Sequence, residues 1–352
     1  GSATPSIESY SKAKNGQYGL IEMHNRVGNR ISNQVDNQVS NNEHNIPNQL
    51  PSIKIIDLRE EMKKRNYSIF SEYLQQRLKE NLIKKEQSIL FLNRRGAASA
   101  MICRDCGESE MCSHCDITLT YHKKILIEDA IMPAQRLICH HCGRIYKIPL
   151  NCKNCGSHAI KYIGVGTQKI EEEVLKLFPQ ARILRADRDT TRKAGDFEQI
   201  YNQFKNQEAD ILIGTQMIGK GLHLPNVTLV GIILADLSLT IPDFRSGEKT
   251  FQLLTQVAGR SGRNKPGEVI IQTYQPEHYS IVDTLHHDYQ NFYNHEIHHR
   301  RETNLPPYSR FLKLTISTCN YQKTPVKFLK NSKNILQRIP LNPSKKSLLS
   351  PP

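Results

Sequence analysis

The chain has 352 residues, which is enough for two domains of ordinary size or for one large domain with an insert, and which excludes a small disulfide-stapled peptide. Hydrophobic residues make up 38% of it, a share low enough to indicate that part of the chain is loop or has no packed core. The formal net charge of +14 suits a polyanionic partner, but half of it comes from seven basic residues between positions 321 and 352. Composition alone therefore leaves the partner open.

No membrane-spanning segment is predicted, because the longest apolar run, residues 229–235, falls far short of the roughly 20 residues that a bilayer requires. The first residues, GSATPSIES, contain neither the basic nor the apolar region of a secretory signal. The sequence therefore predicts a cytoplasmic protein with no membrane partner.

The first part of the chain combines a polar stretch with three predicted elements. Residues 11–52 are rich in asparagine and contain the near-repeat NQVDNQVSNN, which predicts a low-complexity linker. Residues 54–58 are a strand candidate, and apolar residues at three- and four-residue spacing predict an amphipathic helix over 67–85. The apolar run SILFL at 88–92 ends in NRRG and predicts a strand buried on both faces.

A second series of elements follows the cysteines. Helices are predicted at 167–178, 196–206, 249–258 and 289–303, and strands at 182–186, 210–214, 227–234 and 268–273. Short strands that alternate with helices indicate a parallel sheet covered on both faces. The run at 88–92 would be the first strand of this sheet, so the cysteine region would be an insert.

Eight of the nine cysteines form four CxxC pairs: Cys103 and Cys106, Cys112 and Cys115, Cys139 and Cys142, and Cys152 and Cys155. Two such pairs can supply four thiolates to one tetrahedral metal, so the sequence predicts two closed sites for structural zinc. A glycine follows three of the pairs, where a left-handed turn lets backbone N–H groups face the sulfurs. An iron–sulfur cluster and thioredoxin-like redox pairs are the alternatives. The spacing does not decide which pairs share a metal, and Cys319 has no partner in this pattern.

Two motifs combine glycine with basic residues. Residues 214–221 (GTQMIGKG) nearly match a phosphate-binding loop, but Gly221 stands where a magnesium-binding hydroxyl is required, so a working nucleotide loop is not predicted. Residues 256–263 (QVAGRSGR) place Arg260 and Arg263 three positions apart, which suits arginine fingers that grip phosphate oxygens. Surface salt bridges are the alternative for these arginines.

Taken together, these segments resemble one family. SILFLNRRG, GTQMIGKGLHLPNVTLV and LSLTIPDFRSGEKTFQLLTQVAGRSGR, with the four CxxC pairs between the first two, are similar to the primosomal replication-restart DNA helicases (primosomal protein N′) of superfamily 2. The resemblance runs from SATPSIES to about residue 314 and is interrupted by the asparagine-rich stretch. It implies an α/β fold: a RecA-like parallel-sheet motor lobe, the second lobe of a helicase, with an inserted cysteine-rich subdomain that holds two zinc ions.

The resemblance also implies roles for particular residues. Ser2-Ala3-Thr4 is similar to motif III, which couples the ATP and DNA sites, and motifs IV, V and VI follow in order. Contacts to nucleic acid are implied for Asn93, Arg94 and Arg95 of motif IV and for Thr215, Gln216 and Lys220 of motif V. Catalytic roles are implied for Gln256, Arg260 and Arg263 of motif VI, and contacts to ATP for Gly259, Gly262 and the same two arginines.

The family also implies a nested pairing of the cysteines. One zinc would be held by Cys103, Cys106, Cys152 and Cys155, and the other by Cys112, Cys115, Cys139 and Cys142. ATP and Mg²⁺ would bind only in the complete two-lobed enzyme, because the phosphate loop and the acidic magnesium motif of the family's first lobe precede motif III. We therefore expect these 352 residues alone to be inactive.

The resemblance implies part of an ATP-dependent 3′-to-5′ DNA helicase that reloads the replication machinery at stalled forks. Its partners would be forked or single-stranded DNA, other primosome proteins and single-stranded DNA-binding protein. The alternative is a non-enzymatic, zinc-stabilised DNA- or protein-binding module left from a split or decayed helicase gene. A self-sufficient nucleotidase that uses Lys220 is disfavoured by Gly221.

These expectations divide the chain into six segments. They are the end of the first lobe (1–10), the linker (11–52), the start of the second lobe (53–100), the zinc-binding insert (101–158), the remainder of the second lobe (159–285), and a truncated or divergent C-terminal region with a basic tail (286–352).

Overall fold

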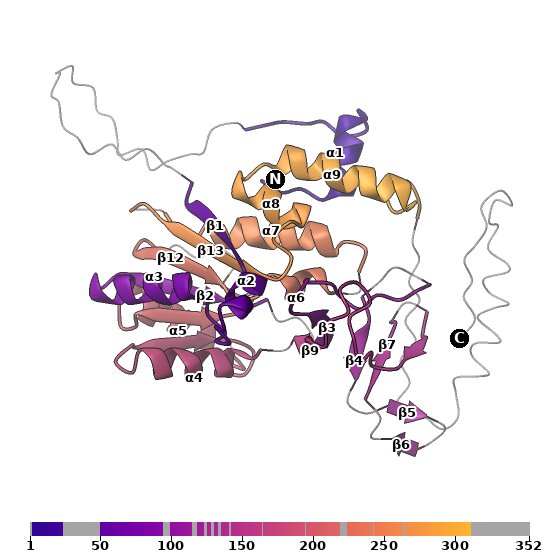
Figure 1. Cartoon of the computed structure of the whole chain (residues 1–352). Coiled ribbons are helices and arrows are strands. Elements are labelled where there is room, and N and C mark those ends of the chain that lie inside the picture. The colour runs from indigo at the N-terminus through magenta and orange to yellow at the C-terminus, as the bar shows by residue number, and fades with distance from the viewer. Residues whose placement is uncertain are drawn as a thin grey trace, which may run out of the picture.

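A computed structural model gives the fold of the chain (Figure 1). It describes residues 2–23, 50–93, 99–114, 118–122, 125–127, 130–132, 135–140, 142–163, 165–193, 195–218, 224–241, 243–262 and 265–310. Most of the predicted linker and the basic tail lie outside the described residues. None of the helices in the described ranges combines the length and the apolarity that crossing a membrane requires.

The main body is a six-stranded parallel sheet in the order β1-β13-β12-β2-β11-β10. Its strands are β1 (Ser52–Asp57), β2 (Gln87–Phe91), β10 (Ile183–Ala186), β11 (Ile211–Gly214), β12 (Val227–Ile232) and β13 (Glu268–Thr273). The predicted parallel sheet is therefore confirmed. The strand at 88–92 is not its first strand, however, because β1 precedes it in the chain and forms one edge of the sheet. The run SILFL lies at the centre because it has apolar side chains for both faces.

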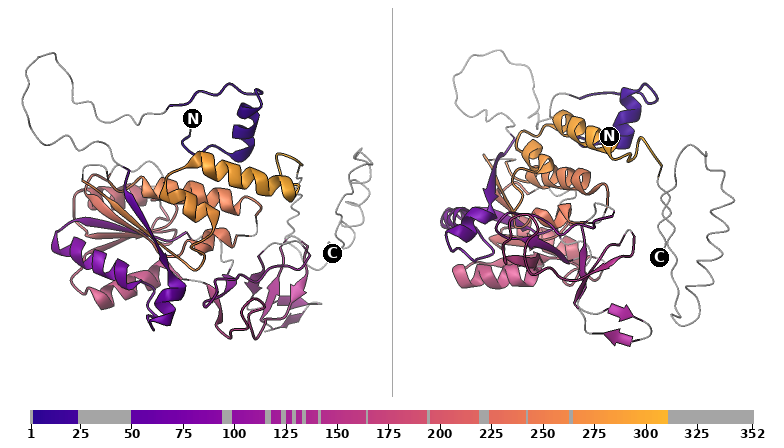
Figure 2. Two further views of the ribbon diagram at one scale, coloured as in Figure 1. Left: turned by 45° about the horizontal axis from the view of Figure 1, so that its top comes forward. Right: turned by 45° about the vertical axis from the view of Figure 1, so that its right-hand side comes forward.

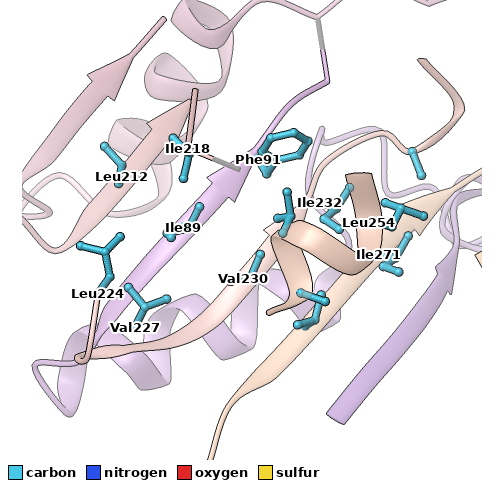
Figure 3. Close-up of a cluster of buried hydrophobic side chains, with 14 of the residues drawn as sticks. Ile89, Phe91, Leu212, Ile218, Leu224, Val227, Val230, Ile232, Leu254 and Ile271 are labelled. Atoms are coloured by element: carbon cyan, nitrogen blue, oxygen red, sulfur yellow. The ribbon is translucent and has the colours of Figure 1, made fainter. Parts of the chain in front are cut away.

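Helices cover both faces of this sheet. One face carries α2 (Leu58–Lys63), α3 (Glu72–Ile83) and α4 (Thr167–Leu177), and the other carries α5 (Asp196–Lys205), α7 (Ser246–Ala258) and α8 (Tyr279–Leu285). Strand β2 and the residue after it contribute side chains to both cores in alternation. Ile89 and Phe91 belong to one cluster, and Leu90 and Leu92 belong to the other. Figure 3 shows the first cluster, where Ile89 and Phe91 lie beside Val230 and Ile232 of the neighbouring strand β12, with Ile271 of β13 beyond them.

Helix α3 is shorter than the periodicity predicts. It begins at Glu72, because the Ser71 hydroxyl accepts a hydrogen bond from the Leu74 N–H (3.2 Å) and caps the helix. Tyr67, which the predicted helix includes, is 72% exposed. The local cap therefore overrides the apolar spacing at this end.

The cysteine region forms a separate small domain between β2 and α4, beside the main sheet (Figure 1). Its five-stranded antiparallel sheet has the order β8-β7-β4-β3-β9, and a hairpin of β5 and β6 extends from it. The strands are β3 (Ser99–Cys103), β4 (Thr120–His122), β5 (Ile125–Ile127), β6 (Ala130–Met132), β7 (Arg136–Ile138), β8 (Ile145–Tyr146) and β9 (Ile160–Ile163).

The two ends of the described chain meet on one side of the molecule. Helix α1 (Ile7–Lys14) packs against α9 (Tyr289–Glu302), which in turn packs on α7 and α8 (Figure 2). Helix α1 thus extends past residue 10, where the first expected segment ends. The segment that resembles the end of a first lobe is attached to the helices of the second.

A buried carboxylate ties the ends of β12 and β13 together. Asp236 begins the short helix α6 (Asp236–Leu239), is fully buried, and accepts hydrogen bonds from the Tyr274 N–H (3.1 Å) and the Thr273 hydroxyl (3.0 Å). Burial raises the pKa of Asp236 to about 6, although the hydrogen bonds from these donors lower it.

This raised pKa predicts a pH-dependent stability. Between the ordinary pKa of the unfolded chain and the raised value, the folded state holds a proton that the unfolded state has lost, so stability falls as pH rises through about 6. From about pH 5.5 to about pH 7.5 the loss should be about 1 kcal/mol. Asp236→Asn cannot ionise and should remove this part of the slope when urea unfolding is measured across that range. Parallel slopes for the two proteins would contradict the assignment.

Candidate functional site

The first cluster of thiols lies where β3 and β9 meet. The sulfurs of Cys103, Cys106, Cys152 and Cys155 lie within 4.8 Å of one another. The Cys103–Cys155 and Cys106–Cys152 sulfur pairs are each 3.6 Å apart. A disulfide requires about 2.05 Å, whereas two thiolates on one tetrahedral zinc at about 2.3 Å are separated by about 3.8 Å. The cluster therefore has the size of a four-thiolate metal site.

The second cluster contains Cys112, Cys139 and Cys142, whose sulfurs also lie within 4.8 Å of one another. The Cys112 and Cys142 sulfurs are 3.7 Å apart, and the Tyr146 hydroxyl lies 3.1 Å from the Cys112 sulfur. Cys115, the fourth expected ligand, lies outside the described residues. The two groups coincide with the nested pairing that the family resemblance implies, and both could hold a metal ion.

Three of the cysteine pairs fold into the same tight turn. In each, the N–H of the glycine after the pair donates to the carbonyl of the first cysteine: Gly107 to Cys103 (2.8 Å), Gly143 to Cys139 (2.8 Å) and Gly156 to Cys152 (2.9 Å). These glycines have φ values of +80°, +74° and +73°, so the left-handed turn predicted from the sequence is present.

The environment of these sulfurs favours a bound cation. Burial raises the pKa of the Cys103 thiol to about 12, while the backbone N–H groups of Asp105 and Cys106 that face its sulfur lower it. A divalent cation supplies the positive charge that a buried thiolate needs. The chemistry of the donor set therefore fits a soft, tetrahedral metal with no open coordination position.

The first cluster is joined directly to the domain of the main sheet. The Gln275 side chain, just after β13, donates to the Gly107 carbonyl (3.0 Å) and to the Ser109 hydroxyl (3.2 Å). Arg59 donates to the Cys106 carbonyl (3.4 Å). A Cβ at Gly107 would lie 2.1 Å from the Tyr274 carbonyl oxygen, so only glycine permits this contact. Neither Gln275 nor Arg59 belongs to a local motif, so the sequence alone does not indicate these contacts.

The residues similar to motifs IV and V meet at the carboxyl edge of the sheet. Gln216, after β11, donates to the Asn93 side-chain oxygen (2.8 Å), and the Asn93 amide donates to the Ser238 hydroxyl. Half-buried Thr215 lies beside them, at the end of β11. Ser238 was not expected, although it lies in the segment LSLTIPDFRSGEKTFQLLTQVAGRSGR, because the resemblance implies roles only for the motif VI residues at the end of that segment. Arg94, Arg95 and Lys220 lie outside the described residues.

The residues similar to motif VI lie at the end of α7. Gln256 is exposed on its last turn, and Gly259 ends the helix with its N–H on the Thr255 carbonyl (3.1 Å). Arg260 is half-buried, and Gly262 adopts a φ of +76°. Arg263 lies outside the described residues.

Two further residues hold this turn in place. The buried Ser261 hydroxyl donates to the Thr228 carbonyl at the start of β12 (2.9 Å). A Cβ at Gly267 would lie 2.1 Å from the Ser261 hydroxyl oxygen, so the turn packs against bare backbone just before β13. The glycine after a proline at 266–267 is the only sequence signal that could have indicated this contact.

The structure thus places the expected site residues at opposite edges of one sheet. Asn93, Thr215 and Gln216 lie at the carboxyl ends of the strands, and Arg260 and Gly262 lie at the amino ends. Strand β12 alone separates the two edges by about 16 Å, at about 3.3 Å per residue. Among the described residues, the two groups therefore lie apart, with the length of the strands between them.

Comparisons with known proteins show what the chain is similar to. Residues 156–265 match the family described as the helicase conserved C-terminal domain. The chain is 48% identical over 318 residues to the replication restart protein PriA of Bacillus subtilis, which covers 90% of this chain and 36% of that protein. Identity to the protein of the same name from Synechocystis is 41% over 319 residues, which covers 89% and 36%.

The chain therefore spans about a third of the length of these curated relatives. Among solved structures, S. cerevisiae Dbp5 bound to RNA and ADP BeF3 has a TM-score of 0.34 at 10% identity, and covers 69% of this chain and 39% of that chain.

The contact between Gly107 and Tyr274 gives a prediction with a matched control. Gly107→Ala and Gly143→Ala both place a side chain at a left-handed φ, but only the former meets backbone, since nothing lies within 4 Å of a Cβ at Gly143. Gly143→Ala should cost about 1 kcal/mol of stability, and Gly107→Ala about 2 kcal/mol more. Urea unfolding of the metal-loaded proteins measures both. Equal losses would show that the insert does not rest on the motor lobe at this point.

Proposed function

We propose that this chain, which belongs to the replication restart protein family, supplies the second motor lobe of an ATP-dependent 3′-to-5′ DNA helicase that reloads the replication machinery at stalled forks. The observation that carries the proposal is the 48% identity over 90% of the chain, which includes the cysteine pairs and both edges of the sheet. The protein would act on chromosomal DNA, in the cytoplasm.

The carboxyl edge of the sheet would contact single-stranded DNA. Amide and hydroxyl groups such as those of Asn93, Gln216 and Thr215 bind phosphate and sugar oxygens without reading sequence. Buried Asn93 accepts a hydrogen bond from half-buried Gln216 and so fixes its side chain, and one strand would meet a prepared surface that includes Gln216 and Thr215. Arg94, Arg95 and Lys220 would add the positive charge that a phosphate backbone attracts.

The amino edge would face ATP bound to the first lobe. Arg260 and Arg263 would reach the phosphates and stabilise the charge that develops on the transferred group, with Gln256 beside them. Gly262, with its φ of +76°, lets the chain turn sharply two residues after Arg260. The first lobe would hold Mg²⁺, and these 352 residues alone would neither hydrolyse ATP nor bind DNA tightly.

The cysteine clusters would each hold one structural zinc ion. Closed sets of thiolates leave no position for a substrate, so zinc would stabilise the insert and take no part in catalysis. The insert would help to separate the strands of forked DNA. It would also contact other primosome proteins and single-stranded DNA-binding protein.

The zinc proposal predicts two equivalents of zinc per chain and no visible absorbance. Cys152→Ser and Cys112→Ser should each retain about one equivalent, because each removes one ligand from a different cluster. Cys319→Ser, outside every CxxC pair, is the control and should retain both. Metal analysis of the purified proteins measures this. A brown colour with iron, or loss of both metals from each single variant, would contradict the proposal.

The arginine role predicts a selective loss of turnover in the two-lobed enzyme. Arg260→Ala and Arg263→Ala should each lower DNA-stimulated ATP hydrolysis by about a thousandfold and leave DNA affinity unchanged. Arg260→Lys should not restore it, because an ammonium lacks the planar fork of donors. Gln216→Ala should do the opposite, weakening DNA binding while basal hydrolysis persists.

Steady-state kinetics and DNA titrations on the same preparations distinguish these outcomes. Retained turnover in Arg260→Ala would overturn the finger role. If the wild-type two-lobed protein binds DNA but hydrolyses no ATP, the result would favour the binding module over the motor.

A further inference from the structure

The segment that resembles motif III is fixed to the helix that carries the residues similar to motif VI. Helix α1 begins just after this segment, with Ser6 as its cap (Ser9 N–H to Ser6 hydroxyl, 3.2 Å). Its Ile7 and Tyr10 are buried in an apolar cluster with Phe251 of α7 and Phe292 of α9. Figure 2 shows α1 lying against α9 in both views.

Two side chains hold the backbone of the segment itself. Gln252 of α7 donates to the Thr4 carbonyl (3.2 Å) and the Pro5 carbonyl (3.4 Å). The Tyr289 hydroxyl of α9 donates to the same Pro5 carbonyl (2.9 Å). Gln252 lies one turn before Gln256, so both side chains project from the same side of α7. A displacement of residues 4–5 is therefore transmitted to α7 one turn before Gln256.

A buried ionic cluster locks the same three helices. Arg300 of α9 is 0% exposed, and its guanidinium donates to Glu296 (2.7 Å), to Glu248 of α7 (2.6 Å) and to Glu8 of α1 (3.1 Å). Burial raises the pKa of Glu248, while the neighbouring Arg300 lowers it. A fully paired charge in this position is expensive to break, because removal of one partner leaves the others buried without compensation.

We propose that Gln252, supported by Arg300 and Tyr289, is a positioning residue of the motor: it clamps residues 4–5 to α7, so that movement of the preceding lobe sets the position of Arg260. The proposal rests on the proposed function. Rigid helices with packed, hydrogen-bonded joints transmit displacement, whereas a loosely tethered segment would absorb it. The sequence predicts a motif III segment but no contact between it and this lobe.

The test uses the complete two-lobed enzyme. Gln252→Ala combined with Tyr289→Phe removes the three hydrogen bonds to residues 4–5, together with the one from Gln252 to Glu248 (3.2 Å), and keeps the ring of Tyr289 in its cluster. The expected result is about a tenfold fall in the kcat of DNA-stimulated ATP hydrolysis, with KM for ATP, DNA affinity and the thermal midpoint unchanged. A lower kcat with an unchanged KM and thermal midpoint distinguishes a positioning role from a structural role.

Gln290→Ala is the matched control. It removes the hydrogen bond from the Tyr10 hydroxyl to Gln290 (2.7 Å), which joins α1 to α9 without involving α7 or residues 4–5. Its kcat should remain that of the wild type. Arg300→Ala is unsuitable as the main variant because the loss of buried charge compensation can unfold the lobe.

An unchanged kcat in the double variant would overturn the clamp, and so would a kcat loss that parallels a lower thermal midpoint or that also appears in Gln290→Ala. These outcomes are distinct from failure of the proposed function, which the wild type and Arg260→Ala report. A wild type with no DNA-stimulated turnover would refute the helicase role, and the clamp with it.

Discussion

The direction of the strands is the constraint on which the rest of the structure depends. All six strands of the main sheet run in parallel, so the residues that follow strands gather at one edge and those that precede strands gather at the other. Gln216 and Asn93 therefore meet across two neighbouring strands, while the turn after α7 packs against the starts of β12 and β13. A lobe built in this way can face DNA with one edge and a nucleotide with the other.

The contacts that the insert and the N-terminal segment make with the lobe restrict their movement relative to it. The first thiol cluster rests on the backbone just after β13 through Gly107 and Gln275, so a metal there would stabilise the motor lobe as well as the insert. The described part of the second cluster lies within the insert. At another place on the lobe, Arg300 holds Glu8 of helix α1, and Gln252 holds residues 4–5 just before that helix. The lobe is thus held on two sides while its two functional edges remain at its surface.

Sequence patterns predicted the regular elements well, because each depends on its own residues. The strand at 268–273 is confirmed with the same bounds, and the glycine turns of the cysteine pairs have the expected positive φ. The central position of SILFL and the contacts of Gln275, Ser238 and Gln252 could not be predicted, because they join residues that lie 123 or more positions apart in the chain or depend on strand order. Motifs thus identified the candidate residues, while the fold decided which of them meet.

The most direct test of the two-edge arrangement is photocrosslinking on the two-lobed enzyme. Single-stranded DNA that carries a photoreactive group should label peptides that contain Asn93 or Gln216, and a photoreactive ATP analogue should label the peptide that contains Gln256 and Arg260. Peptide mapping of the separated products measures both in one preparation. Labelling of the same edge by both probes, or a reversed assignment, would contradict the account.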